Sequence, residues 1–417
     1  MKKQLLTAFL LSITTLVLIS CQKETRINKD PQNVSSINPS GIDAKEQSKK
    51  IYVNNVGELY AAINDPENTG GTIILNAGTY TLNATYPKAG RLELQNNMSL
   101  VGQPGHPDAV VIDITALPLT SFTLPASTNR TGAIRLGDGN NSLEWITFQN
   151  NPAHTVRSLI QTDIVTTSSA QIRVAHCIIK GSSIGLSIIN RDLMASGRML
   201  EAEVEDNEMM NNTIQQFGSA IQIQNTTTTD AALKVKMSRN YIHGNKAGML
   251  IFNSSSQNCN VEVKSYDDRI ENNGIGMVLN GGFILLSSAP SLHNKLHFEG
   301  YATTIRNNIG TPAPPFAFPP TGIHAAGGQS MPPFDIPGTA HFNELEVYLN
   351  GCQIEDNGGT AQINAYGAHS FYPTSTPAGS NNKTSIYLRG ISANANINSM
   401  NSFPSEPAGT NSVNVYR

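Results

Sequence analysis

Hydrophobic and polar residues alternate over short runs along much of this chain, and the runs recur in a fixed internal order. Five Asn residues mark the repeat, with an Ile or Met three positions before each one. A Leu or Val stands twelve positions before the Asn, and an Ala, Val or Phe stands ten positions before it. The five marker residues are Asn212, Asn245, Asn273, Asn308 and Asn357.

Alternation with a period of two places successive side chains on opposite faces of a β-strand. Each repeat therefore predicts one strand well before the marker Asn and a second short strand that carries the Ile. A third apolar strand usually follows a Gly after the marker, as in residues 274–279. Three short strands cannot bury their apolar faces alone, whereas stacked coils of such strands can. The pattern thus predicts an all-β solenoid.

This repeat resembles the pectate-lyase-like superfamily, in which stacked Asn side chains form a ladder at the turn after the second strand. The resemblance covers roughly residues 51–400, and residues 72–82 are similar to the first coil of such proteins. It implies a single-stranded right-handed parallel β-helix. Asn55 and Glu58 form a capping box, which predicts a short helix that closes the N-terminal end of the core.

Composition narrows the functional classes without naming a reaction. Of the 417 residues, 14% are charged, and the formal net charge is -3. A chain without excess positive charge gives no bulk electrostatic case for nucleic-acid binding, so no nucleic-acid partner is expected. Cys177, Cys259 and Cys352 are expected to be buried free thiols, because the repeat places them too far apart for a disulfide.

The start of the chain has the form of an export signal. Lys2 and Lys3 precede an apolar run that is too short for a committed membrane span. The run ends in Leu-Ile-Ser-Cys at residues 18–21, which resembles the lipobox of bacterial lipoproteins. The resemblance implies cleavage before Cys21 and attachment of lipid to it.

Three regions follow from this interpretation. Residues 1–20 form the signal peptide, residues 21–50 form the lipidated Cys and a flexible polar tether, and residues 51–417 form the β-helix domain. The expected localisation is the outer membrane, on the cell surface or the periplasmic face. Contact with the membrane is expected through the lipid alone, and a capped solenoid of this kind is expected to be a monomer.

The residues that point outward from the first strand of each coil are almost all charged. They lie eleven and nine positions before the marker Asn, between the inward Leu and Val positions. The resemblance implies a substrate groove along this outer face. The first column is Glu201, Lys234, Glu262, His297 and Glu346, and the second is Glu203, Lys236, Lys264, Glu299 and Tyr348.

Three interpretations of this strip remain open. Opposite charges on neighbouring strands can simply pair, at about 0.2–1 kcal/mol each, as Glu203 beside Lys236 would. Lys236 and Lys264, however, occupy equivalent places on neighbouring coils, and like charges so placed should lower the pKa of one member. One Lys would then neutralise an acidic sugar while the other abstracts a proton, which is what β-elimination of a uronate requires. Alternatively, Glu203 and Glu299 would serve as the acid and base of a glycosidase.

Further residues are expected to contact a glycan. Lys234, His297, Glu346 and Tyr348 lie in the strip itself. Residues 364–383 are interpreted as an aromatic loop beside Tyr348. Its candidate sugar-binding residues are Tyr366, Phe371 and Tyr372.

The specific motifs of known members of the superfamily are missing, so their functional residues cannot be carried over. No metal site and no cofactor is predicted, although calcium is left open because Asp267, Asp268 and the acidic residues 201–208 could offer carboxylate oxygens. The favoured function is action on an extracellular polysaccharide, possibly acidic, as a lyase or hydrolase. The alternatives are a non-catalytic glycan-binding or adhesive lipoprotein and a purely structural β-helix.

Overall fold

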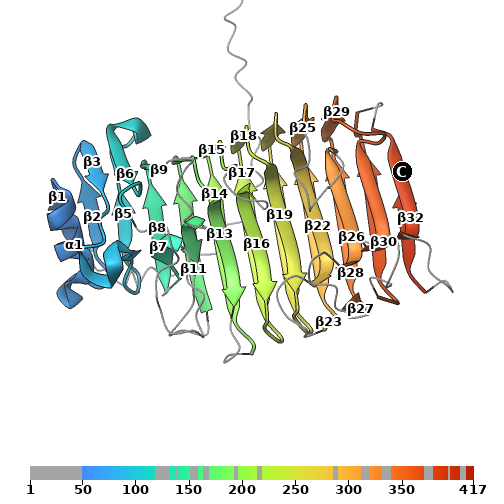
Figure 1. The fold of residues 1–417 in the computed structure, drawn as a ribbon, viewed down its shortest axis with the longest axis horizontal. Helices are drawn as coiled ribbons and strands as arrows, with labels where there is room; N and C mark the ends of the chain where they lie inside the picture. Colours follow the sequence, from blue (N-terminus) through green and yellow to red (C-terminus); the bar gives the residue numbers. More distant parts are fainter. Residues whose placement is uncertain are drawn as a thin grey trace, which may run out of the picture. The chain divides into compact units, whose positions relative to one another are not determined.

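The computed structural model describes residues 49–417 apart from short internal stretches. These stretches are 118–131, 138, 151–157, 163–168, 192–195, 214–217, 285–289, 311–319, 331–339, 371–378, 393–394 and 404–409. Within the described residues the chain winds through three long sheets in turn, so that most coils add one strand to each sheet (Figure 1). A further pair of short strands comprises β23 (Ser291–Leu292) and β27 (Ala340–His341).

We call the three sheets A, B and C, in the order in which each coil visits them. Sheet A contains β1 (Lys50–Val53), β2 (Thr72–Leu75), β5 (Ser99–Val101), β8 (Asn140–Glu144), β11 (Ser169–Ala175), β14 (Met199–Glu205), β17 (Ala232–Ser238), β20 (Asn260–Tyr266), β24 (Lys295–Tyr301), β28 (Glu344–Asn350), β31 (Lys383–Arg389) and β33 (Ser412–Tyr416). Sheet B contains β3 (Gly78–Thr81), β6 (Val110–Asp113), β9 (Thr147–Gln149), β12 (Ile178–Lys180), β15 (Glu208–Met210), β18 (Tyr241–His243), β21 (Arg269–Glu271), β25 (Thr304–Arg306) and β29 (Gln353–Glu355). Sheet C contains β4 (Leu92–Glu93), β7 (Gly132–Leu136), β10 (Ser158–Thr162), β13 (Ile184–Arg191), β16 (Ser219–Thr226), β19 (Ala247–Ser254), β22 (Ile275–Ile284), β26 (Ile323–Ser330), β30 (Ile363–Ser370) and β32 (Ile397–Phe403).

The strands of each sheet pair in parallel, which confirms the predicted right-handed parallel β-helix. The register of sheet A joins the apolar positions of the repeat directly, as in Leu200 opposite Leu233 and Leu233 opposite Val261. All three side chains are fully buried. The inward residues of the three sheets thus form one continuous apolar core along the coils.

The α-helix α1 (Val56–Asn64) closes the N-terminal end of this core beside β1 and β2 (Figure 1). The side-chain oxygen of Asn55 accepts a hydrogen bond from the N–H of Glu58, as the capping box predicts. The Glu58 carboxylate accepts a hydrogen bond from the N–H of Asn54, whereas a capping box predicts a bond from the N–H of Asn55. Among the described residues, no helix combines the length and the apolar character that crossing a membrane requires.

The five marker Asn residues form the predicted ladder at the turn between sheets B and C. The N–H and side-chain amide of each donate to the side-chain oxygen of the next, at 2.8–3.1 Å. The amide of Asn245 also donates to the buried carbonyls of Met209 and His243. The ladder therefore satisfies turn groups that no strand partner reaches.

Two more ladders occupy the other corners, and these were not predicted. Asn207, Asn240 and Asp268 stand five positions before successive markers and connect at the turn between sheets A and B. The ladder before sheet A consists of Asn294, Asn343, Asn382 and Asn411. The three cysteines also lie at these corners, buried and free as expected: Cys177, Cys259 and Cys352.

Asp268 gives a prediction about pH. Its carboxylate accepts hydrogen bonds from Asn240 and Ser265 and is completely buried. Burial raises the pKa of Asp268 to about 6, although these hydrogen bonds act in the opposite direction. The folded state therefore binds this proton more tightly than the unfolded chain, and folding loses up to about 3 kcal/mol as the pH rises from about 4 to above 6.

Asp268→Asn keeps the acceptor oxygen and removes the titration. We expect the variant to be more stable than the parent at pH 7, with a flatter dependence of unfolding free energy on pH between 4 and 7. Urea unfolding at several pH values measures this. An unchanged pH slope would show that Asp268 stays ionised inside the ladder.

Candidate functional site

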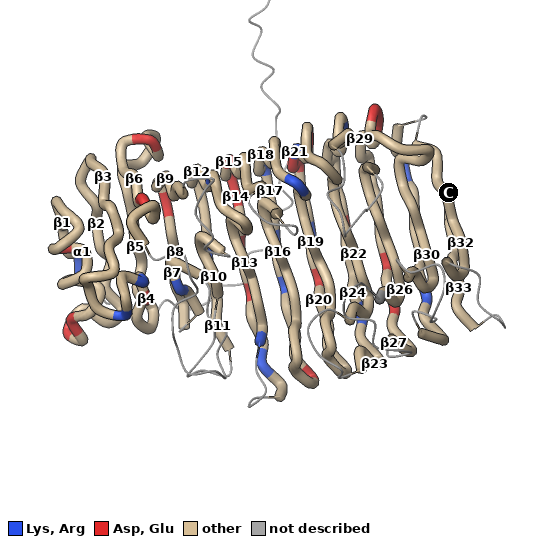
Figure 2. The backbone as a smooth tube through the Cα atoms, in the orientation of Figure 1, with Lys and Arg blue, Asp and Glu red and all other residues tan. Residues whose placement is uncertain are grey.

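The outer face of sheet A carries the two predicted columns in the predicted register. Glu201, Lys234 and Glu262 are successive partners, and so are Glu203, Lys236 and Lys264. The columns continue through His297 and Glu299 to Glu346 and Tyr348. Positive and negative residues are interspersed along the described coils (Figure 2).

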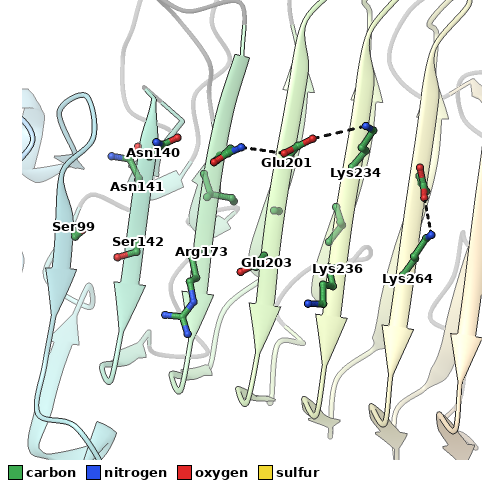
Figure 3. Close-up of a pocket in the computed structure, with 15 residues that line it drawn as sticks. Ser99, Asn140, Asn141, Ser142, Arg173, Glu201, Glu203, Lys234, Lys236 and Lys264 are labelled. Atoms are coloured by element: carbon green, nitrogen blue, oxygen red, sulfur yellow. Dashed lines mark hydrogen bonds and ion pairs between the residues drawn. The ribbon is translucent and has the colours of Figure 1, made fainter. Parts of the chain in front are cut away.

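A groove of about 530 Å³ runs over the first part of this face, from β5 to β20. We call it the charged groove (Figure 3). Several of its charges are paired: Lys234 lies 3.8 Å from the Glu201 carboxylate, and Lys264 lies 3.2 Å from the Glu262 carboxylate. Its outward polar residues are Ser99, Asn140, Ser142, Gln171, Arg173, Glu201, Glu203, Lys234, Lys236, Glu262 and Lys264.

Glu203 and Lys236 differ from these pairs. They are opposite each other on β14 and β17, yet no ion pair joins them, so the pairing interpretation is wrong at this place. Within the described part of the chain, neither side chain forms a hydrogen bond or ion pair. Both are exposed to the groove. A free carboxylate and a free ammonium group therefore lie side by side among charges that are already neutralised.

Lys264 departs from the expectation that one Lys of the pair has a lowered pKa. The hydrogen bond to Glu262 and the nearby charge of Glu299, 3.9 Å away, raise the pKa of Lys264. The two flanking carboxylates thus hold Lys264 in its charged form. Lys264 suits the role of a fixed cation and does not suit that of a base.

Glu299 belongs to a tight hydrogen-bonded network on β24. Tyr301 donates to one of its oxygens at 2.6 Å, and the other lies 2.7 Å from a ring nitrogen of His297. The second ring nitrogen of His297 lies 3.2 Å from Glu346. Burial acts to raise the pKa of Glu299, but the bonds from Tyr301 and His297 outweigh it, and the pKa is lowered. The same balance, with bonds from Lys295 and His297, lowers the pKa of Glu346.

The spacing argues against Glu203 and Glu299 as a glycosidase pair. Three strand steps separate β14 from β24, which is about 14 Å along the sheet. Acid and base carboxylates lie about 5–9.5 Å apart in the two known arrangements. Glu299 is also held ionised by its network, whereas a general acid needs a raised pKa.

Tyr348 lies in a row of stacked rings at the C-terminal end of the face. Its ring is 4.2 Å from that of Tyr387 and nearly parallel to it, and Tyr387 is 4.6 Å from Tyr416. His297 lies over the remaining side of Tyr348 at 5.0 Å. The faces of the inner rings are therefore covered and cannot stack on sugars. Burial is the main cause that raises the pKa of Tyr348 to about 12.

The structure corrects the placement of Tyr366, which was expected in an aromatic loop beside Tyr348. Tyr366 lies within β30 of sheet C, not in a loop, and is buried against His324 and His369. Strand β30 is buried throughout, like the recognised β22, but polar residues such as Asn364 and His369 interrupt its apolar run, so the strand was not recognised. Phe371 and Tyr372 lie outside the described residues.

Several of the carboxylates considered for calcium are used by the fold. Asp268 completes a buried ladder, Asp206 pairs with Arg239 at 2.6 Å, and Glu205 contacts Arg239 at 3.4 Å. Within the described ranges, no cluster of three His, Cys, Asp or Glu side chains has the arrangement of a metal site.

Arg173 was missed by the sequence analysis although it lines the charged groove. It lies 2.6 Å from Glu144 and also pairs with Glu205. In its coil Ser182 takes the place of the marker Asn and donates its N–H to Asn212. Arg173 stands nine positions before Ser182, so a repeat search that allowed Ser at the marker would have found it.

Comparison with models of known protein families and with curated protein sequences gives no match. Among solved structures, the A-module of the Azotobacter vinelandii mannuronan C-5 epimerase AlgE4 is similar at 15% identity, with a TM-score of 0.48 over 87% of this chain and 95% of that one. Pectate lyase Pel9A is similar at 12% identity, with a TM-score of 0.37 over 86% and 79% of the two chains. The catalytic unit of the GH87 alpha-1,3-glucanase from Streptomyces thermodiastaticus is similar at 10% identity, with a TM-score of 0.34 over 89% and 68%. These similarities are low, and the β-helix fold is established by the strand pairing itself.

The contrast between the two Lys residues can be measured by chemical labelling. With limiting acetic anhydride and peptide mass spectrometry, we expect Lys236 to react faster than Lys264, because the carboxylates hold Lys264 protonated. Glu262→Gln removes the main cause of the raised pKa and should increase the labelling rate of Lys264 severalfold, while Lys383 on β31 serves as an unchanged reference. Equal rates for Lys264 in parent and variant would contradict this assignment.

Proposed function

We propose that this chain binds an extracellular acidic polysaccharide along the charged groove and cleaves it by β-elimination. The observation that carries the proposal is the free Lys236, which lies beside the carboxylate-held Lys264 in a groove whose other charges are largely paired. A groove that follows the outer face of stacked strands suits a linear polymer.

The roles of the two Lys residues follow from their surroundings. The Lys264 ammonium group attracts the carboxylate of a uronate unit and stabilises the negative charge that develops on it during the reaction. Lys236, in its uncharged amine form, takes the proton from the carbon that bears this carboxylate. The electron pair then forms a carbon–carbon double bond, and the glycosidic C–O bond at the next carbon breaks. The departing oxygen acquires a proton from solvent or from the Lys236 ammonium group, which balances the reaction.

Glu203 supports this proposal as a positioning group. It lies opposite Lys236 without binding it, so it is free to accept hydrogen bonds from sugar hydroxyls. Its negative charge also repels a uronate carboxylate toward the Lys264 side. Lys234, His297 and Glu346 then line the continuation of the same face.

A second candidate function is glycan binding without catalysis. It is favoured by the many ion pairs on the face, since Lys264, Glu262, Glu299 and Glu346 are all engaged with other side chains. Under this alternative the free Lys236 would attract the polymer and break no bond.

Depolymerisation assays separate the two. Purified protein that begins at Gln22 is incubated with acidic and neutral polysaccharides, and unsaturated uronyl ends are followed by ultraviolet absorbance together with new reducing ends. We expect unsaturated product from at least one acidic polymer.

Three variants assign the site. Lys236→Ala should lower kcat by about 100-fold or more, as expected for loss of a general base. Lys236→Arg should lower kcat equally but retain binding, because Arg keeps the charge and cannot act as a base at neutral pH. Lys383→Ala, outside the groove, should change neither kcat nor polymer binding. Binding without product on every polymer would favour the second function, and reducing ends without unsaturation would contradict β-elimination.

We also propose that the chain is an outer-membrane lipoprotein held by lipid on Cys21, which lies outside the described residues. The sequence of residues 1–21 supports this. In cells labelled with palmitate, the parent protein should carry label and partition into detergent, and Cys21→Ser should do neither. Label retained in the variant would place the lipid elsewhere, and an unlabelled parent would contradict lipidation.

A further inference from the structure

A second groove continues the charged groove toward the C-terminal end of sheet A. It has a volume of about 440 Å³ and is lined by residues of β24, β28, β31 and β33. We call it the tyrosine groove. The two grooves meet at the Lys264–Glu299 ion pair, since Lys264 lines the first and Glu299 lines the second. A polymer that follows the outer face would pass from one to the other.

The charges that line the tyrosine groove are unequal. Glu299 is the only lining residue with a carboxylate side chain among the described residues, and Tyr301 and His297 already bind it. Arg389 and Arg417 are exposed, and within the described part of the chain their guanidinium groups form no hydrogen bond or ion pair. Two free guanidinium groups at one end of a groove attract an anionic group, and their fork geometry suits carboxylate or sulfate oxygens.

The Tyr row determines what else this groove offers a ligand. Because Tyr348, Tyr387 and Tyr416 stack on one another, the inner rings present edges and hydroxyl groups rather than faces. Phenol hydroxyls both donate and accept hydrogen bonds, which suits the hydroxyl groups of a sugar. The stacked rings also hold one another in place, so these hydroxyls are fixed before a ligand arrives.

We infer that the tyrosine groove is a second subsite, which binds an acidic unit of the same polysaccharide that lies in the charged groove. Arg389 is the residue that holds the acidic group. It lies on β31, four strand steps from Lys236 on β17, a distance of about 19 Å along the sheet. The protein therefore selects long acidic chains, because only an oligomer of several sugar units reaches both cations. This inference rests on the proposed function in placing the chain along sheet A.

The test measures affinity for acidic oligosaccharides of increasing length, from disaccharide to decasaccharide, by isothermal calorimetry. Oligogalacturonates and oligoalginates are the probes, and neutral oligosaccharides of the same length are the reference. The parent protein should show a clear gain in affinity once the oligomer spans both grooves. Arg389→Ala should remove this gain, about tenfold or more in affinity for long acidic oligomers, without changing the affinity for short ones. Lys383→Ala, on the same strand but outside the groove, is the matched control.

The outcomes separate this inference from the proposed function. If Arg389→Ala weakens the binding of long oligomers while Lys236→Ala affects neither binding nor cleavage, the second subsite stands and the proposed function fails. If Lys236→Ala abolishes cleavage while Arg389→Ala binds every length as the parent does, the proposed function stands and the second subsite is overturned. An equal loss of affinity in Arg389→Ala for short and long oligomers, or for neutral and acidic ones, would also overturn the second subsite.

Discussion

Each coil of this protein is held in register with the next by parallel strand pairing and by buried ladders of side-chain amides. The strand hydrogen bonds fix the distance between coils, and the ladders satisfy backbone groups at the corners where strand pairing stops. Register is decisive here, because a slip by one residue would turn every inward Leu and Val out to solvent. The ladders also resist such a slip, since each amide fits only the equivalent residue of the neighbouring coil.

The same constraint determines what the surface can do. Residues at equivalent positions become neighbours about 4.8 Å apart, so the outer face of sheet A is a set of columns rather than a scattered surface. In these columns most charges neutralise one another, as Lys264 does with Glu262. The exceptions stand out for that reason: Glu203 with Lys236 near the middle of the face, and the guanidinium groups of Arg389 and Arg417 at its end. The proposed linear acidic polymer would reach both sets of cations as it lies along this face.

The fold and the columns could be predicted because inward and outward positions alternate strictly on sheet A. Leu200 and Val261 identify the core, and Glu201 and Lys236 then follow as outward residues. Contacts between outward side chains could not be predicted in this way, because each long side chain can reach several partners with similar interaction energies. Lys264 forms ion pairs with Glu262 and Glu299, which leaves Lys236 without an ion-pair partner and keeps Lys264 charged.

Sheet C shows the second reason for failure. Strand β30 is buried on both faces and carries polar residues such as Asn364 and His369 within that buried run, and Tyr366 was assigned to a loop beside Tyr348. The Tyr row had a signal in the sequence, because Tyr387 stands at a strand position equivalent to Tyr348. The consequence of this row for sugar binding had no signal in the sequence, because only the coordinates show that the rings cover one another.

The most direct test of the central claim is a crystal structure of the protein with a long acidic oligosaccharide. The account predicts sugar units along the outer face of sheet A, with a carboxylate of the oligosaccharide within hydrogen-bond distance of Lys236 Nζ or Lys264 Nζ. An oligosaccharide bound at saturation to the outer face of sheet B or sheet C, with the charged groove empty, would contradict it.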